Sequence, residues 1–254
     1  MNNLISLSKF GNAKVGENTL IINMGPATTC PSAERGLCPI AGKCYAARDE
    51  RLYEARGAIM PYRQKQQAYW LGNDAEQIAF DIQEIFEGYE RVHYRKVDKA
   101  IASAKAAHRK RPKREAPKKI VRWNESGDFH SMECVEKLMK IAELTPDILY
   151  YTYTHRTDLV ELLEGRPKNL IIQVSVDNQK DSDKYNKLGF NTFFTDTTIS
   201  IRNRKKVEGL DPHEGATKLL KAKYGKNALV CKWSCENCSL CKVQHAKPIH
   251  ICIH

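Results

Sequence analysis

Short apolar runs recur along the second half of the chain, and polar residues follow each of the first four. The runs cover residues 120–123, 148–153, 169–176, 190–195 and 228–230. Apolar runs of about four to eight residues between turn signals are typical of buried strands. The polar residues that follow are Asn124-Glu125-Ser126-Gly127-Asp128, Thr154-His155-Arg156, Asp177-Asn178 and Asp196-Thr197-Thr198. The pattern therefore predicts a series of strands with polar C-terminal ends.

Helical patterns lie between these runs. Residues 131–144 place their apolar side chains on one stripe, which predicts an amphipathic helix. A second helix is expected to begin at Asp158 and to end before Gly165-Arg166-Pro167, because glycine and proline stop helices. Strands that alternate with helices at this spacing indicate parallel βαβ units.

The N-terminal half has a different organisation. Residues 18–23 form an apolar run that Gly25-Pro26 interrupts, and residues 30–45 are a loop rich in cysteine, proline and glycine. Residues 46–110 are helical in pattern. Pro112 and Pro117 then predict an exposed connector without helix.

Together these elements predict an α/β fold with a partial (β/α) barrel. The polar strand ends would meet at one edge, where parallel barrels bind their ligands. We expect one unit over residues 1–227, which holds the cysteine loop, a helical and basic insertion and the barrel core. Residues 228–254 would form a C-terminal cysteine-rich metal-binding segment.

Composition narrows the class of protein. The chain has 254 residues, of which 42% are hydrophobic and 28% are charged, as in an ordinary globular protein. No apolar run approaches the roughly 18–20 residues that a membrane helix needs. The N-terminal segment lacks the continuous apolar core of a secretory signal. We therefore expect a cytoplasmic protein that does not associate with a membrane.

Positive charge is concentrated in one segment. Residues 91–119 contain twelve Lys or Arg residues and two acidic residues, a net charge of +10 against +11 for the whole chain. Such a basic arm favours weak, salt-dependent binding of nucleic acid phosphates. The residues expected to bind are Arg109, Lys110, Arg111, Lys113 and Arg114. The alternative is a solvated loop without a partner.

Four cysteines cluster near the C-terminus. Cys231, Cys235, Cys238 and Cys241 follow a C-x3-C-x2-C-x2-C pattern. Clustered cysteines in an intracellular chain are read first as metal ligands. Zinc sites commonly use two separated Cys-x-x-Cys pairs, whereas overlapping x2 spacings occur in ferredoxin-like runs. The pattern favours a [4Fe–4S] cluster, with zinc as the alternative metal.

A second group contains Cys30, Cys38 and Cys44. Three ligands on one metal centre leave a coordination position open, where a substrate or S-adenosylmethionine could bind. The alternatives are ordinary loop thiols or ligands of a structural zinc. Outside both groups, Cys134 is predicted to lie in the core, because it falls on the apolar stripe of residues 131–144. Cys252 is predicted to lie in a terminal strand, although His250 and His254 share its face.

Polar side chains at two strand ends form a candidate catalytic group. Glu125, Asp128 and His130 follow the first run of the second half, and His155-Arg156 follow the next. In a parallel barrel these ends are neighbours. A carboxylate, an imidazole and a guanidinium could carry out acid–base chemistry or hold a phosphate. We predict catalytic roles for Asp128, His155 and Glu125; the alternative is a structural hydrogen-bond network.

Four motifs together resemble one protein family. They are Thr29-Cys30-Pro31 through Cys44-Tyr45-Ala46, the segment from Arg122 to Phe129, Tyr151-Thr152-Tyr153-Thr154, and Val230-Cys231 through Cys241. In these motifs the chain resembles the gene-product-eighty-eight family of phage and plasmid proteins. If a phage encodes the chain, its compartment would be the cytoplasm of the host cell.

The layout of this family is similar to that of radical S-adenosylmethionine enzymes. The resemblance implies that Cys30, Cys38 and Cys44 hold a catalytic cluster and that the C-terminal cysteines hold an auxiliary one. It also implies that Glu125, Ser126 and Gly127 bind the cofactor, at the strand end where such enzymes hold its amino group. The C-x7-C-x5-C spacing departs from the usual C-x3-C-x2-C of that chemistry.

Two functions follow from these observations. The first is an iron–sulfur enzyme of radical type that acts on nucleic acid or nucleotides. The second is a non-catalytic, metal-stabilised module that binds nucleic acid or a host protein. A hydrolase that uses Asp128 and His155 is a third and weaker interpretation.

Overall fold

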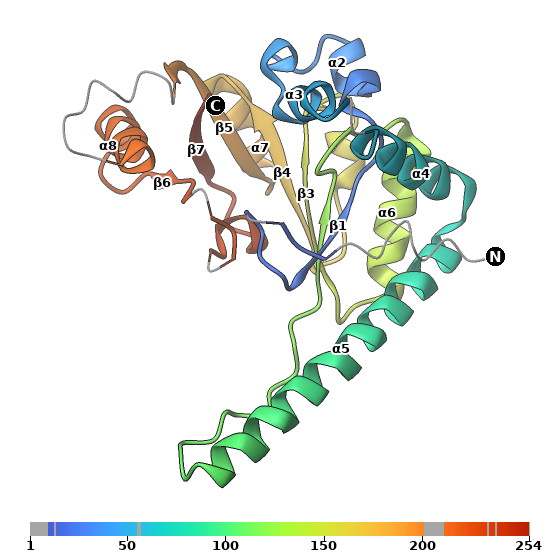
Figure 1. Ribbon diagram of the computed structural model, residues 1–254. Helices are drawn as coiled ribbons and strands as arrows, with labels where there is room; N and C mark the ends of the chain where they lie inside the picture. Colours follow the sequence, from blue (N-terminus) through green and yellow to red (C-terminus); the bar gives the residue numbers. More distant parts are fainter. Residues whose placement is uncertain are drawn as a thin grey trace.

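The computed structural model describes residues 10–12, 14–54, 57–200, 211–232, 234–236 and 238–253. These residues form a seven-stranded sheet in the order β1-β2-β3-β4-β5-β7-β6, with every pair of neighbouring strands parallel (Figure 1). The strands are β1 (Thr19–Ile22), β2 (Ile120–Trp123), β3 (Leu149–Thr154), β4 (Leu170–Val176), β5 (Asn191–Ser200), β6 (Leu229–Val230) and β7 (Pro248–Ile253).

Helices precede, connect and flank these strands. The α-helices are α2 (Pro31–Glu34), α3 (Tyr45–Leu52), α4 (Ile59–Gly72), α5 (Ala75–Ala106), α6 (Met132–Leu144), α7 (Gln179–Lys187) and α8 (Pro212–Tyr224). Short 3-10 helices are η1 (Ala27–Thr29), η2 (Ala41–Lys43), η4 (Val160–Leu163) and η6 (Leu240–Lys242). Within the described chain, no helix is long and apolar enough to span a bilayer.

The strand order distinguishes this sheet from a doubly wound one. Strands β1 to β5 lie side by side in the order in which they occur in the chain, whereas a doubly wound sheet reverses its order at a switch point. Right-handed crossovers in a single direction place their helices on one face of the sheet. The prediction of an α/β fold with parallel strands is confirmed. The sheet is open, with β1 and β6 at its edges.

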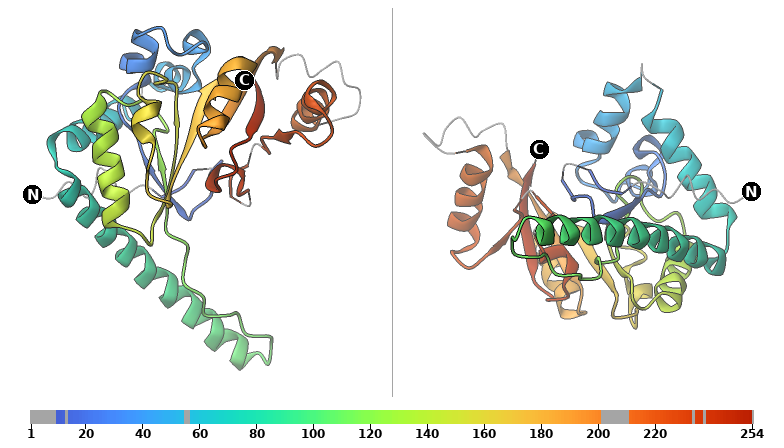
Figure 2. Two further views of the ribbon diagram at one scale, coloured as in Figure 1. Left: turned by 180° about the vertical axis from the view of Figure 1, so that it is seen from behind. Right: turned by 60° about the horizontal axis from the view of Figure 1, so that its bottom comes forward.

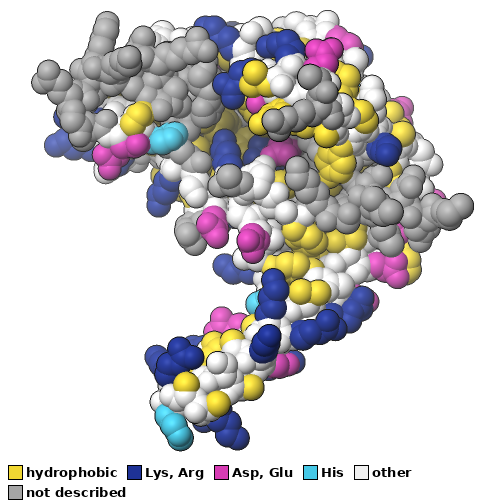
Figure 3. All heavy atoms as spheres, viewed as in Figure 1, with side chains coloured by type: hydrophobic (Ala, Val, Ile, Leu, Met, Phe, Trp, Pro, Cys, Tyr) yellow, Lys and Arg dark blue, Asp and Glu magenta, His cyan; other side chains and the backbone are white. Residues whose placement is uncertain are grey.

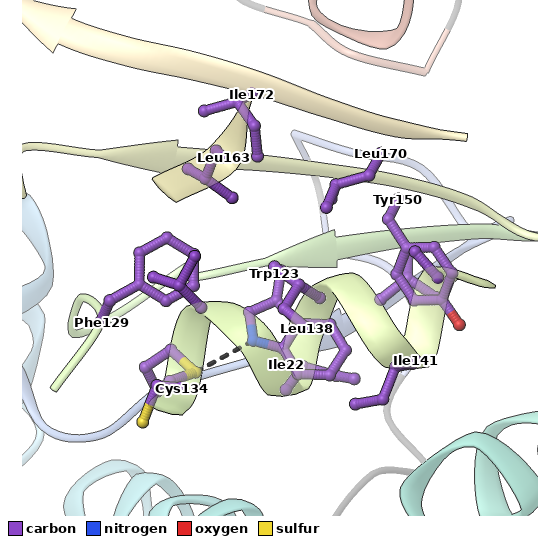
Figure 4. Close-up of a cluster of buried hydrophobic side chains, with 14 of the residues drawn as sticks. Ile22, Trp123, Phe129, Cys134, Leu138, Ile141, Tyr150, Leu163, Leu170 and Ile172 are labelled. Carbon is purple, nitrogen blue, oxygen red and sulfur yellow. Dashed lines mark hydrogen bonds between the residues drawn. The ribbon is translucent and has the colours of Figure 1, made fainter. Parts of the chain in front are cut away.

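The helix-covered outer face of the sheet holds the main hydrophobic core. Alternate strand residues, among them Ile22, Trp123 and Ile172, meet Leu138 of α6 and other side chains that Figure 4 shows in one layer. The indole N–H of Trp123 donates to the Met24 sulfur at 2.9 Å. Each large apolar side chain buried in this way contributes about 1.5–3 kcal/mol to stability.

Cys134 belongs to this core. It lies on α6 at the edge of the side chains drawn in Figure 4, and only 4% of the residue is exposed. The prediction of a core position is confirmed. Cys134 belongs to a different hydrophobic cluster from Cys44, Cys231 and Cys241.

The opposite, inner face of the sheet is covered by the C-terminal segment. Residues 231–243 pack through Cys231 and Cys241 against apolar side chains that point inward from the strands, including Tyr151, Ile171 and Ile249. Strands β6 and β7 on either side of this segment join the same sheet as β1 to β5. The cysteine-rich segment is thus built into the sheet.

Helix α5 carries the basic arm away from this body (Figures 1 and 2). Its first half buries side chains such as Ile78 and Phe86 in the core, whereas its second half is mostly exposed. The connector 107–119 returns along it without helix, as Pro112 and Pro117 predict. Arg114 fastens the connector to α5, because its Nε lies 2.9 Å from an Asp98 oxygen.

Several elements differ from their predicted bounds. Strand β5 continues through Thr195 to Ser200, because the β-branched residues 197–199 extend it past Asp196. The helix expected from Asp158 is only the 3-10 turn η4. Helices α7 and α8 were not predicted; α7 is strongly polar, so its sequence carries little periodic signal. The strand expected over 249–254 is β7, and His254 lies outside the described residues.

A buried carboxylate joins α8 to the sheet. Asp196 of β5 accepts hydrogen bonds from Lys223 at 2.8 Å and from Tyr224 at 2.9 Å. Burial alone would raise the pKa of Asp196, but these bonds and those from Thr198 lower it to about 2. The ionised form therefore stabilises the fold above the ordinary carboxyl pKa near 3.8.

We predict that Asp196→Asn lowers the free energy of unfolding by about 1–2 kcal/mol at pH 7. The difference from wild type should shrink as pH falls from about 4 towards about 2, because the wild-type carboxylate becomes protonated there. Denaturant titrations at several pH values measure both effects. Asp183→Asn, at an exposed site on α7, is the matched control; equal effects of the two substitutions would contradict the prediction.

Candidate functional site

One cavity lies at the C-terminal ends of the parallel strands, and both cysteine groups contribute to its lining. From the predicted metal ligands it takes Cys30, Cys38, Cys44, Cys231 and Cys235. From the predicted catalytic and cofactor-binding residues it takes Glu125, Ser126, Gly127, Asp128 and His155. Residues more than two hundred positions apart in the sequence therefore share one site.

A buried ion pair fixes the start of the cysteine loop. Glu50 of α3 accepts hydrogen bonds from the backbone N–H groups of Ala27 at 2.7 Å and Thr28 at 3.2 Å. Arg63 of α4 donates to Glu50 at 2.6 Å and to the Ala46 carbonyl at 3.0 Å. The pair thus holds the backbone that leads into Cys30. Sequence reasoning missed it, because neither residue stands in a distinctive motif.

The three thiols of this loop are half-buried and unbridged. Cys30 lies 3.1 Å from the Ser32 hydroxyl, and Cys44 packs against the small side chains of Ala27 and Ala46. Burial, together with charge on Cys44 and Cys30, raises the pKa of Cys38 to about 12. All three thiols line the same cavity.

The C-terminal cysteines lie beside two inward-pointing tyrosines of β3. Burial raises the pKa of Cys241 to about 12, although a hydrogen bond with Tyr153 acts in the opposite direction. The hydroxyl of Tyr151 is buried and has no hydrogen-bond partner among the described residues. Negative charge on Cys235 or Cys241 acts to raise the pKa of the Tyr151 hydroxyl.

The predicted metal ligands do not form a single-ion site among the described residues. In the described part of the chain, no three Cys, His, Asp or Glu side chains converge on a point where one metal ion could sit. A cubane cluster takes one thiolate on each of its irons and so spreads its ligands more widely than tetrahedral zinc. The unpartnered Tyr151 hydroxyl is a donor of the kind that hydrogen-bonds cluster sulfur. The identity of the metal stays a prediction.

The turn after β2 forms the floor of the cavity by packing against the turn after β1. Ser126 donates from Oγ to the Gly25 carbonyl at 3.0 Å, and its own carbonyl accepts from the Met24 N–H at 2.9 Å. Gly127 has φ +74, and a Cβ there would lie 2.8 Å from the Gly25 nitrogen. Only glycine allows this approach of the two backbones.

Asp128 organises the neighbouring strand ends. Its carboxylate accepts from Thr154 Oγ1 at 2.7 Å, from the His155 N–H at 2.8 Å and from the Phe129 N–H at 2.8 Å. Asn124 adds a longer bond at 3.3 Å. Burial raises the pKa of Asp128, although these bonds act against the shift. With its oxygens engaged in this way, Asp128 is suited to positioning β2 and β3, and its catalytic role stays a prediction.

His155 is the better placed acid–base candidate. Burial lowers its pKa despite the nearby charges of Asp128 and Asp177, so the imidazole is neutral at pH 7. Its Nδ1 is buried and has no partner among the described residues, and the side chain lines the cavity. A neutral imidazole with a free nitrogen can accept a proton or ligate a metal.

The remaining predicted residues lie apart from this group. His130 turns away and pairs with Gln67 at 2.7 Å. Arg156 is bound on two sides, by Asp158 at 2.8 Å and by the His130 carbonyl at 3.1 Å, which makes it a structural clamp. Neither Cys238 nor Cys241 lines the cavity, and Cys241 belongs to the same hydrophobic cluster as Tyr153.

The predicted nucleic-acid-binding residues do not reach the cavity. Arg109, Lys110, Arg111 and Lys113 are exposed on the connector near the tip of the arm. Figure 3 shows Lys and Arg side chains along the arm on both sides of a narrow body. Arg114 lies nearer the helix, with its guanidinium 4.3 Å from the centre of the Tyr94 ring.

We predict that Gly127→Ala lowers the free energy of unfolding by about 2–4 kcal/mol, because it adds a backbone clash to the strain of a positive φ. Gly165→Ala is the matched control: Gly165 has φ +71, and nothing lies within 4 Å of its added Cβ. It should cost only about 1 kcal/mol. Chemical denaturation measures both values, and equal losses would show that the close approach to Gly25 is unimportant.

A family model described as Gene product 88 matches residues 6–244. The match includes both cysteine groups and β1 to β6, and the resemblance expected from the four motifs is therefore confirmed at the level of the family. No curated protein and no solved structure matches the chain.

Proposed function

For this chain, which belongs to the Gene product 88 family, we propose an iron–sulfur enzyme of radical S-adenosylmethionine type that acts on nucleic acid or nucleotides. The observation that carries the proposal is the shared cavity at the C-terminal edge of the sheet. There the three-cysteine loop, the four-cysteine segment and the polar strand ends meet. The sequential order of parallel strands supports a partial (β/α) barrel, the architecture that this chemistry implies.

Cys30, Cys38 and Cys44 would hold a [4Fe–4S] cluster and leave one iron free for the cofactor. They follow β1 directly, and η1 and α2 present them at the strand's C-terminal end. When bound and reduced by an external electron donor, such a cluster would supply the one electron needed for reductive cleavage of S-adenosylmethionine. The chain's task is to bind and orient the reactants and to exclude water.

The turn after β2 would bind the amino end of the cofactor. Glu125 is half-buried at the cavity wall, and its backbone carbonyl accepts a hydrogen bond from Tyr45 at 2.7 Å. Tyr45 follows Cys44 directly, so this bond couples the turn to the cysteine loop. Carboxylate and carbonyl oxygens on this turn are acceptors for an ammonium group. His155, held neutral by burial, would accept or donate a proton on the opposite wall.

The four C-terminal cysteines would hold a second, auxiliary cluster against the inner face of the sheet. Tyr153 hydrogen-bonds Cys241, and Lys242 donates to the Cys235 carbonyl at 2.8 Å, so the segment is held on both sides. Hydrogen bonds to cluster sulfur tune reduction potential. In this role Tyr151 and Tyr153 of β3 would both pack against the segment and donate hydrogen bonds to the cluster.

The projecting arm favours a second function, a metal-stabilised module that binds nucleic acid without catalysis. An ordered, basic and exposed arm is compatible with either function. In the enzyme it would bring a polyanionic substrate to the body; in the module it would be the whole binding site. A module of this kind needs the metal only for folding and makes no use of the cavity.

We predict that protein purified without oxygen contains about eight irons per chain, as two cubane clusters require. Reduced protein should convert S-adenosylmethionine to 5′-deoxyadenosine. Cys38→Ala should lose about half of the iron and all of this activity, because it removes a ligand beside the open iron. Iron and sulfide analysis and chromatography of the products measure these results.

Cys134→Ala is the matched control for that experiment. It removes a sulfur from the core on the other side of the sheet, so it should keep its iron and its activity and lose only about 1 kcal/mol of stability. Fully loaded protein that leaves S-adenosylmethionine intact would overturn the enzymatic proposal. Colourless protein with one or two zinc ions would leave the binding module.

For the arm, we predict that replacing Arg109, Lys110 and Arg111 by Gln weakens binding of a single-stranded oligonucleotide at low salt by about tenfold or more. The slope of log affinity against log salt should fall by about two, because each lost phosphate contact contributes about 0.7. Fluorescence anisotropy measures both quantities. Replacing the exposed Lys180, Lys187 and Lys221 is the control, and an equal loss there would mean that the arm has no special role.

A further inference from the structure

Arg122 is a buried cation on the inner face of β2. Only 6% of the residue is exposed, and it lines the cavity between the two cysteine groups. Within the described chain, no carboxylate lies within ion-pair distance of its guanidinium. Its Nε is buried and has no hydrogen-bond partner there. A buried charge is costly unless an opposite charge or a full set of hydrogen bonds compensates it.

The groups around Arg122 favour its charged form without making an ion pair with it: although burial acts to lower the pKa of the guanidinium, Tyr45, Tyr151, Tyr153 and Glu125 raise it. One terminal nitrogen donates to the Tyr45 hydroxyl at 3.3 Å, and the ring centre of Tyr153 lies 5.3 Å from the guanidinium carbon. Tyr151 is its register partner on β3. Glu125 is near enough for its charge to be felt but makes no ion pair with it. The guanidinium is thus held by aromatic groups in a residue that lines the cavity.

Two other buried arginines show what full compensation is like in this fold. Arg63 meets Glu50 at 2.6 Å, and Arg156 meets Asp158 at 2.8 Å. Both arginines donate their hydrogen bonds to oxygen atoms of the protein. Arg122 differs from them because, among the described residues, no carboxylate is paired with it, and it lines the cavity.

We propose that Arg122 binds the anionic group, a carboxylate or a phosphate, of the molecule that the cavity takes up. The guanidinium fork matches both groups and is well suited to bind either with paired hydrogen bonds. The proposal rests on the proposed function in one respect only, that a small molecule enters the space between the cysteine groups. A carboxylate would identify the anion as the amino-acid end of S-adenosylmethionine, whereas a phosphate would place a nucleotide substrate there.

Two pairs of probes distinguish these sources. S-adenosylhomocysteine and 5′-methylthioadenosine differ by the amino-acid end, and adenosine monophosphate and adenosine differ by the phosphate. Calorimetric titration of anaerobically purified protein should show that the anionic member of one pair binds at least about tenfold more tightly. Arg122→Gln should abolish that preference while binding the neutral member as wild type does. The pair in which wild type shows this preference identifies the anion as a carboxylate or a phosphate.

Thermal unfolding separates this role from a structural one. Because Arg122 lacks a counter-charge, Arg122→Gln should unfold within about 2 °C of wild type when no ligand is present. Arg63→Gln, which leaves Glu50 buried and unpaired, is the matched control and should unfold at least about 5 °C lower. The preferred anion should raise the unfolding temperature of wild type and of neither the Arg122→Gln protein nor a sample given the neutral probe.

Three results would overturn the proposal. They are a wild-type protein with no preference for the anion in either pair, an Arg122→Gln protein that keeps the preference, and an Arg122→Gln protein that loses binding of both members equally. Iron content is measured on the same samples. Protein without iron that still prefers an anion through Arg122 would end the iron–sulfur proposal and leave the anion site standing. Protein that holds both clusters but shows no such preference would end the anion-site proposal and leave the iron–sulfur proposal standing.

Discussion

The sequential pairing of parallel strands is the constraint on which the rest of this structure depends. Because each strand from β1 to β5 lies beside the next one in the chain, the crossovers return on the same side and cover only the outer face. The inner face still carries apolar residues such as Tyr151 and Ile171, which need a second cover. The described residues of the C-terminal cysteine segment cover this face through Cys231 and Cys241, and the same packing brings Cys231 to the cavity.

The same constraint brings the remaining parts of the site together. All C-terminal strand ends open at one edge, so the turns after β1 and β2 must pack against each other, and Gly127 allows the contact. The Glu50–Arg63 pair then holds the cysteine loop over that edge. Asp128, which follows β2, accepts hydrogen bonds from Thr154 and His155 at the end of β3 and so links the two strands. The site is thus a consequence of the sheet, with a few buried polar groups that fix its walls.

Sequence reasoning recovered the parts that leave a local signal. The strand over Ile120–Trp123 has its predicted bounds, and the position of Cys134 follows from a helical stripe. The gathering of the polar strand ends at one edge follows from the βα alternation. Other features depend on contacts between distant segments, which leave no periodic trace. The Glu50–Arg63 pair, the C-terminal cover of the inner face and the uncompensated charge of Arg122 are of this kind.

The central proposal is that the two cysteine groups hold two neighbouring clusters beside one cavity, which Cys30, Cys38, Cys44, Cys231 and Cys235 line. Low-temperature electron paramagnetic resonance of the fully reduced protein tests it most directly. Our account predicts a spectrum broadened by magnetic interaction between two clusters, which becomes that of one isolated cluster when Cys235 and Cys238 are replaced by Ala. A spectrum that is the simple sum of two independent centres, or that lacks an iron–sulfur signal, would contradict it.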